Sequence, residues 1–174
     1  MYNAITRDIE VELLGCLRYF GIKFYAYNIL AGGILSGKHK YEDYDNNSIK
    51  KGRFYGDNPW AQYYRHRFWS KSKFDGIELV KKTINKVYGD KVSLVEASMR
   101  WVMHHSMLGK DDGVILGAST IKHFNDNLSA LKNKEPLNDE VVNAFNKAWE
   151  MSKGVCPSYI GDHMTIKYVP PLKQ

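Results

Sequence analysis

Hydrophobic residues recur at helical spacing in five stretches of the chain. In the first of them, Ile9 and Leu13 are four residues apart and therefore share one face of a helix. The same pattern predicts helices over residues 7–20, 71–88, 94–107, 121–132 and 139–153. We expect Thr6, Ser93 and Asn138 to cap three of these helices, because their side-chain oxygens can accept hydrogen bonds from the free N–H groups of a first turn.

Two short apolar segments have the composition of strands rather than a helical period. Residues 24–28 are rich in aromatic β-formers, and residues 114–119 form an apolar run that we expect to be a strand buried on both faces. The resulting order is helix, strand, long connection, two helices, strand and two helices, which is typical of an α/β protein. Two strands are too few for a parallel sheet with helices on both faces, so the pattern indicates an incomplete α/β domain or half of a barrel.

The segment over residues 38–69 shows no sustained period, and we expect it to be a long loop. Ten of the chain's aromatic residues lie between Lys38 and Asp75, whereas disordered segments are poor in aromatic residues. A long loop in a compact domain that is not disordered is usually functional. This segment is therefore a candidate for contacts with a ligand.

Composition and charge narrow the class of protein. The 174 residues are 44% hydrophobic and 25% charged, which excludes a disordered chain. The net charge of +6 leaves open a solvated basic surface, an anionic cofactor or substrate, and a nucleic-acid partner. No apolar run approaches the roughly 18–20 residues of a membrane span, and the charged N-terminus does not support a signal peptide. Cys16 and Cys156 lack the spacing of a zinc or redox motif, so we expect reduced, buried thiols in a cytoplasmic protein.

Two segments after the predicted strands could bind an anion. The glycines from Gly32 to Gly37 resemble a phosphate-binding turn, but His39 stands where a P-loop needs Ser or Thr, and taken alone the segment is better explained as an ordinary flexible turn. Ser119 and Thr120 precede the helix over residues 121–132, where free N–H groups favour anions. The alternative there is a plain helix cap.

Arginines and aromatic residues alternate over residues 60–69. If this part is helical, Tyr64 and Arg67 share a face while Arg65 points elsewhere. Such a pair could bind a carboxylate or stack on bases, or the loop could be packed by its own aromatic residues with arginines reaching water. The histidines, including the adjacent His104 and His105, have no metal-binding spacing.

Several stretches together resemble one known family. They are Met1–Ala4, Phe24–Asn28, Ala31–Gly33, Gly52–Phe54, Tyr64–Trp69, Leu116–Ser119 and Cys156–Pro157. In this order and spacing the chain resembles the C-terminal half of an aldo-keto reductase of the aflatoxin-aldehyde and succinic-semialdehyde reductase type. The resemblance implies an α/β fold: strands 7 and 8 of an incomplete (β/α)8 TIM barrel with their helices, with Met1–Asn3 ending strand 6. Residues 1–160 would form this part and residues 161–174 an irregular tail.

The resemblance also implies NADPH as cofactor and assigns residues to it. Tyr27 would lie against the nicotinamide, and Asn28 to Lys38 would surround the pyrophosphate. The implied cofactor-binding residues are Tyr27, Asn28, Leu30, Gly32, Gly33, Lys38, Arg53, Ser119, Thr120, His123 and Asn127, with the last four at the 2′-phosphate and adenine end. Tyr64 and Arg67 match the substrate-binding pair, and the substrate would be a small aldehyde or ketone.

The chain departs from the family in two respects. The family's catalytic Asp, Tyr, Lys and His lie on the first half of the barrel, so we expect this chain to lack them and to hold no metal. Gly161 stands where the subfamily has a substrate-binding Arg, which disfavours acidic aldehydes. We therefore predict a fragment of an NADPH-dependent reductase that converts aldehydes or ketones to alcohols, with no nucleic-acid or membrane partner and a dimer as a property of the full-length parent. The alternatives are a non-catalytic relative that binds a partner protein and an anion- or nucleic-acid-binding module.

Overall fold

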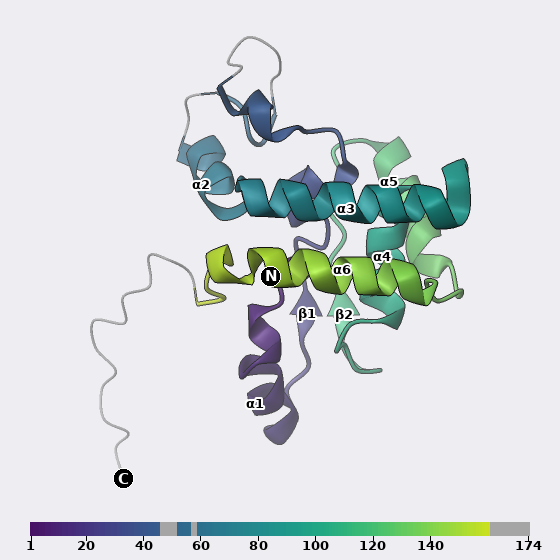
Figure 1. The fold of residues 1–174 in the computed structure, drawn as a ribbon. Helices are drawn as coiled ribbons and strands as arrows, with labels where there is room; N and C mark the ends of the chain where they lie inside the picture. The colour runs from purple at the N-terminus through teal and green to yellow at the C-terminus, as the bar shows by residue number, and fades with distance from the viewer. Residues whose placement is uncertain (46–51, 57–58, 161–174) are drawn as a thin grey trace.

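The computed structural model describes residues 1–45, 52–56 and 59–160 of the chain (Figure 1). The six α-helices of this part are α1 (Leu13–Tyr19), α2 (Pro59–Phe68), α3 (Lys71–Tyr88), α4 (Leu94–His104), α5 (Ile121–Lys132) and α6 (Asp139–Ser152). The two strands are β1 (Tyr25–Ala26) and β2 (Gly113–Val114). Short 3-10 turns complete the order: η1 (Asp8–Glu10), η2 (Ala31–Ser36), η3 (Tyr41–Asp45), η4 (Gly89–Lys91) and η5 (Lys153–Val155).

Helices α3 and α6 form the outer layer and lie side by side in Figure 1. Each buries an apolar face, including Phe74, Ile77 and Val80 on α3 and Phe145 on α6. The two helices approach closely at Gly76, where an added Cβ would lie 2.9 Å from the Cβ of Ala148. Helix α4 packs against α5 and against η2, which closes the core behind this layer.

The sheet consists of β1 and β2, which are parallel and place Tyr25 opposite Gly113. The N–H of Ile115 donates to the carbonyl of Ala26 at 2.8 Å. On the other side of β1, the N–H of Tyr2 donates to the carbonyl of Tyr27 at 3.1 Å, so the start of the chain runs beside this strand. Because parallel strands end at the same edge, the turn after β1 and the helix after β2 leave from one edge of the sheet.

Most predicted helices are confirmed. Helices α3 and α5 have the predicted bounds, and α4 and α6 end three residues and one residue early, respectively. Ser93 caps α4 by accepting from the N–H of Glu96, and Asn138 caps α6 by accepting from the N–H of Glu140. The helix predicted over residues 7–20 is divided into η1 and α1, and no side chain caps either, so the cap assigned to Thr6 is wrong.

Three further expectations are wrong. The loop over residues 38–69 contains α2, whose first residue, Pro59, has a backbone angle already suited to a helix. The strand predicted over residues 114–119 is limited to Gly113–Val114 and is half-buried rather than buried on both faces, and Ile115, which follows it, is exposed. Cys16 is exposed rather than buried, and Cys156 is half-buried. The tail over residues 161–174 lies outside the described residues.

Over the described ranges, none of the helices is long and apolar enough to cross a membrane. The same residues contain no group of three His, Cys, Asp or Glu side chains that could hold a metal ion. His104 and His105 instead bond the main chain, at the carbonyl of Asn133 and the N–H of Leu137.

Candidate functional site

The turn after β1 is built on unusual backbone conformations. Asn28 and Ala31 have φ values of 57° and 50°, and Gly32 and Gly33 have φ values of 70° and 115°. The carbonyl of Asn28 accepts a hydrogen bond from Nδ2 of Asn3 at 2.9 Å, which ties the turn to the start of the chain. A Cβ added at Gly33 would meet nothing within 4 Å, so open space lies over this part of the turn.

Arg53 and Tyr64 both contact this turn. Nη1 of Arg53 donates to the carbonyl of Gly32 at 3.4 Å, and its guanidinium lies 5.0 Å from the centre of the Tyr64 ring. A Cβ added at Gly32 would lie 2.9 Å from Cδ1 of Tyr64, so only glycine fits there. Arg65 donates to the carbonyl of Phe54 at 2.6 Å, which ties α2 to the segment that carries Arg53. The structure thus brings together the turn, the arginine and one residue of the predicted substrate pair.

Arg67, the other member of that pair, is a buried cation near the end of α2. Its residue is 7% exposed, its guanidinium lies 4.5 Å from the centre of the Tyr63 ring, and its buried Nε has no hydrogen-bond partner. No acidic side chain pairs with it within the described part of the chain. The contact with Tyr63 agrees with the alternative of a segment packed by its own aromatic residues. The buried Nε without a partner is suited to an acceptor group of a ligand.

A second group of predicted residues lies at the start of α5. Thr120, not Ser119, is the cap: its Oγ1 accepts from the N–H of His123 at 3.1 Å. Oγ of Ser119 lies 3.2 Å from Nδ1 of His123, and Asn127 is buried one turn further along. Lys122 is exposed and paired with Asp126 at 2.8 Å. The exposed Ser119 and Thr120 and the helix N-terminus leave an open group of hydrogen-bond donors.

The remaining predicted residues differ in exposure. Tyr27 follows β1 and is 41% exposed, Leu30 is half-buried and Lys38 is exposed. Together with the turn, these residues belong to the segment that leaves the carboxyl end of β1, as the prediction requires. Gly161 lies outside the described residues.

Sequence reasoning missed Lys73. This residue is 1% exposed, and its Nζ donates to the carbonyl of Arg67 at 2.9 Å and to that of Val155 at 3.1 Å. Burial lowers the pKa of its ammonium group to about 8. A signal was present: Lys73 lies four residues before Ile77 and seven before Val80, so it belongs to the apolar face of α3.

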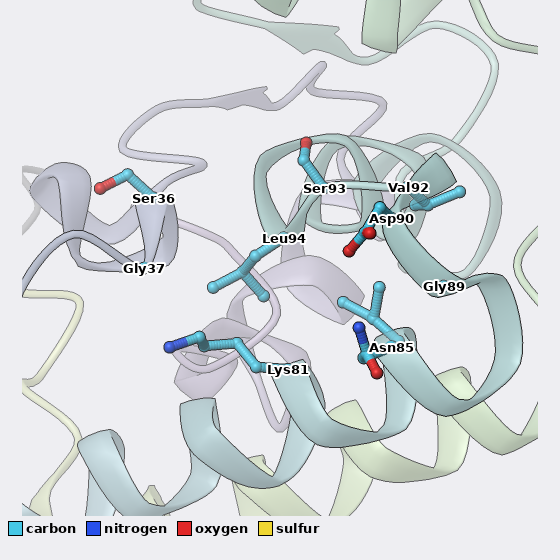
Figure 2. Close-up of a pocket in the computed structure, with 10 residues that line it drawn as sticks. Ser36, Gly37, Lys81, Asn85, Gly89, Asp90, Val92, Ser93 and Leu94 are labelled. Atoms are coloured by element: carbon cyan, nitrogen blue, oxygen red, sulfur yellow. The ribbon is translucent and has the colours of Figure 1, made fainter.

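A shallow hollow of about 360 Å³ lies between the end of η2, α3 and the start of α4 (Figure 2). Two of its polar side chains are already engaged, since Nζ of Lys81 bonds Glu78 at 2.7 Å and Oγ of Ser93 accepts from the N–H of Glu96 at 3.1 Å. Ser36 and Gly37, which belong to the segment predicted to surround the pyrophosphate, line this hollow, whereas Arg53, Tyr64, Arg67 and the start of α5 do not. The candidate site is the turn, Arg53, Tyr64, Arg67 and the start of α5.

Comparison with known proteins identifies the family to which the chain belongs. The aldo/keto reductase family model matches residues 1–150, so the chain belongs to the aldo/keto reductase family. This family implies a (β/α)8 barrel, and its members use NAD(P)H. The helix-rich structure with two described strands is consistent with a part of such a barrel.

Several known proteins match most of this chain. The chain is 49% identical over 162 residues to aflatoxin B1 aldehyde reductase member 2 of Rattus norvegicus and to aldo-keto reductase family 7 member A3 of Homo sapiens. These matches cover 91% of this chain, but 43% and 48% of the two relatives. An aldo-keto reductase of Pseudocercospora fijiensis is 34% identical over 154 residues, which are 87% of this chain and 50% of the relative. The chain thus spans about half the length of the curated relatives it matches.

Proposed function

We propose that residues 1–160 are the C-terminal part of an NADPH-dependent aldo-keto reductase barrel, which binds the cofactor phosphates and the substrate. In this proposal β1 and β2 are strands 7 and 8, and Met1–Asn3 end strand 6. The contact of Arg53 with both Gly32 and Tyr64 is the observation that carries the proposal. It joins a turn suited to phosphate, a cation and an aromatic side chain at the edge of the sheet where ligands of parallel α/β folds bind.

The residues present fit a dinucleotide. Open space over Gly33 and the adjacent Arg53 guanidinium suit a pyrophosphate, around which residues from Asn28 to Lys38 would lie. Ser119, Thr120, His123 and Asn127 would hold the 2′-phosphate and adenine end through hydroxyl, imidazole and amide donors. Tyr27 would lie against the nicotinamide. When bound, NADPH supplies a hydride to a carbonyl carbon.

Arg67 would orient the substrate. Its guanidinium is buried without an acidic partner, so an acceptor group of an aldehyde or ketone substrate would satisfy it. Tyr64 would form one wall of the same site through its contact with the Gly32 turn. The relatives' names include an aflatoxin aldehyde, and we propose aldehydes as the substrate class here.

The proton that completes the reduction would come from the part of the relatives that this chain does not match. The residues assigned here bind and orient, and none of them is assigned as a catalytic acid. The free thiols of Cys16 and Cys156 agree with a reducing compartment and support a cytoplasmic location.

A chimera tests this proposal. Residues 1–160 would replace the matching segment of the rat relative, and NADPH oxidation would be followed with a simple aldehyde. We expect turnover close to that of the rat enzyme from the chimera and none from the 174-residue chain alone, because general acid catalysis contributes about 10²–10⁴-fold. A folded chimera that binds NADPH but shows no turnover would favour the non-catalytic alternative. A folded chimera that does not bind NADPH would refute the cofactor assignment.

A further inference from the structure

Lys73 lies where three segments distant in the sequence come together. Its ammonium group donates to the carbonyl of Arg67 near the end of α2, and to that of Val155 at the end of η5, which continues α6. Cys156 follows directly, and the electrostatic influence of Lys73 on its thiol places the two groups close together. The third segment is α3 itself, in whose first turn Lys73 lies.

The position of this lysine is unfavourable for α3 but favourable for the other two segments. A cation in the first turn of a helix opposes the helix dipole, and burial of an ammonium group without an anion is costly. The same cation is well placed at the carboxyl ends of α2 and η5, where carbonyl groups lack partners within the helix. The free energy lost by placing this cation in α3 is therefore offset by the hydrogen bonds that it donates at these two ends.

One of those ends carries the candidate substrate-binding group. The carbonyl that Lys73 binds belongs to Arg67 itself, whose guanidinium is buried with an unpartnered Nε. A second bond from the same ammonium group fixes the segment that leads to Cys156 and Pro157. We propose that Lys73 is a positioning residue, which holds the main chain of Arg67 and the Cys156–Pro157 segment in one arrangement so that the guanidinium faces the substrate. This inference rests on the proposed substrate role of Arg67.

Binding of succinate to the 174-residue chain tests the inference, since a carboxylate can pair with a guanidinium. The readouts are the succinate Kd and the ¹⁵Nε–¹Hε signal of Arg67. We expect Lys73→Met to weaken succinate binding by at least about tenfold, which corresponds to about 1.4 kcal/mol, and to shift the Arg67 signal even without succinate. Lys71→Met is the matched control, because Lys71 is exposed on the same helix turn and bonds only Asp75. It should change neither readout.

The outcomes separate this inference from the proposed function. A Lys73→Met chain that melts at a lower temperature but keeps the succinate Kd and the Arg67 signal would overturn the positioning role and leave the role of Arg67 intact. A natural chain in which succinate does not shift the Arg67 signal would overturn the positioning role, while the aldehyde turnover of the chimera would still decide the proposed function.

A measurement on the unaltered chain covers the case in which Lys73→Met does not fold. Succinate should shift the ¹⁵Nζ signal of Lys73, because that atom bonds the carbonyl of Arg67. The ¹⁵Nζ signal of the exposed Lys71 should stay in place. A Lys73 signal that does not move while the Arg67 signal does would overturn the positioning role.

Discussion

The outer layer of α3 and α6 and the sheet of β1 and β2 differ in how far their surfaces are covered. The helices interlock at Gly76 and bury their apolar faces against each other and the core. The sheet leaves Tyr25 60% and Ile115 54% exposed, and the N–H of Val114 on the outer edge of β2 has no described partner. The layer is therefore covered within the described residues, whereas the sheet leaves one edge and part of one face open.

The difference also separates the packed core from the proposed site. Side chains of the α3–α6 contact fill the core, while Gly32, Arg53, Tyr64 and Ser119 lie at the carboxyl edge of the open sheet. Lys73 connects the layer to the candidate site, because it lies on α3 and binds the carbonyl of Arg67 on α2. Substitutions in the two regions should therefore have distinct consequences.

The largest expected effect is the dependence of stability on pH through Lys73. Burial lowers the pKa of its ammonium group from 10.5 to about 8, so the folded chain releases this proton before the unfolded chain does. The contribution of Lys73 to the free energy of unfolding should rise by about 3 kcal/mol as pH increases from about 8 to 10.5. Urea unfolding of the natural chain and of Lys73→Met at pH 7.5, 8.5 and 9.5 measures how this contribution changes with pH.

The comparison of the two chains is needed because other groups act in the opposite direction. Burial raises the pKa of the Cys156 thiol and of the Tyr2 hydroxyl, so their contributions are lost as pH rises above the ordinary pKa values of 9.0 and 10.0. Parallel pH profiles for the natural chain and Lys73→Met would contradict the burial of a charged Lys73.

A smaller effect should come from the closest point of the helix layer. In Gly76→Ala the new Cβ would lie 2.9 Å from the Cβ and 3.0 Å from the Cα of Ala148, so α3 and α6 must separate. We expect a loss of about 1–3 kcal/mol in the free energy of unfolding, measured by urea titration. Gly15→Ala is the control: its Cβ would meet nothing within 4 Å in α1, and the better helix former should stabilise the chain by up to about 1 kcal/mol. Equal effects at both glycines would refute the close packing.

The smallest effect should come from Asp112, whose side chain joins the segments before β1 and β2. The carboxylate of Asp112 accepts from the N–H groups of Phe24 at 2.8 Å and Gly109 at 2.7 Å, and from Arg18. Asp112→Ala leaves these donors unpaired and should cost about 1–2 kcal/mol. Asp111→Ala, at an exposed neighbour, should cost almost nothing. Thermal unfolding of the two variants measures this difference. Equal melting temperatures would show that Asp112 does not hold the strands together.

The helix layer could be predicted from the sequence because its signals are local. The apolar period of α3 and the caps at Ser93 and Asn138 involve residues within a few positions of each other. Helix α2 was not predicted because it consists largely of aromatic and basic residues, which give no clear apolar face. The apolar period of α3 places Lys73 on the buried face, but its partner at the carbonyl of Val155, 82 residues away, is revealed by no local pattern.

The candidate site was only partly predictable. The glycine turn and the donors before α5 follow from local sequence, but each alone allowed an ordinary turn or cap. The contact of Arg53 with Gly32 and Tyr64 depends on the folding of the segment between them, so only the resemblance to a family anticipated a shared role.

The most direct test of the cofactor assignment is the ratio of kcat/KM for NADPH to that for NADH in the chimera. Ser119→Ala and His123→Ala together remove donors at the start of α5. Loss of charge-assisted hydrogen bonds of about 1.5–3 kcal/mol should lower the ratio by roughly one to two decades. Lys122→Ala, at an exposed lysine paired with Asp126, is the control and should change the ratio little. An unchanged ratio in the double variant would show that the 2′-phosphate does not bind at the start of α5.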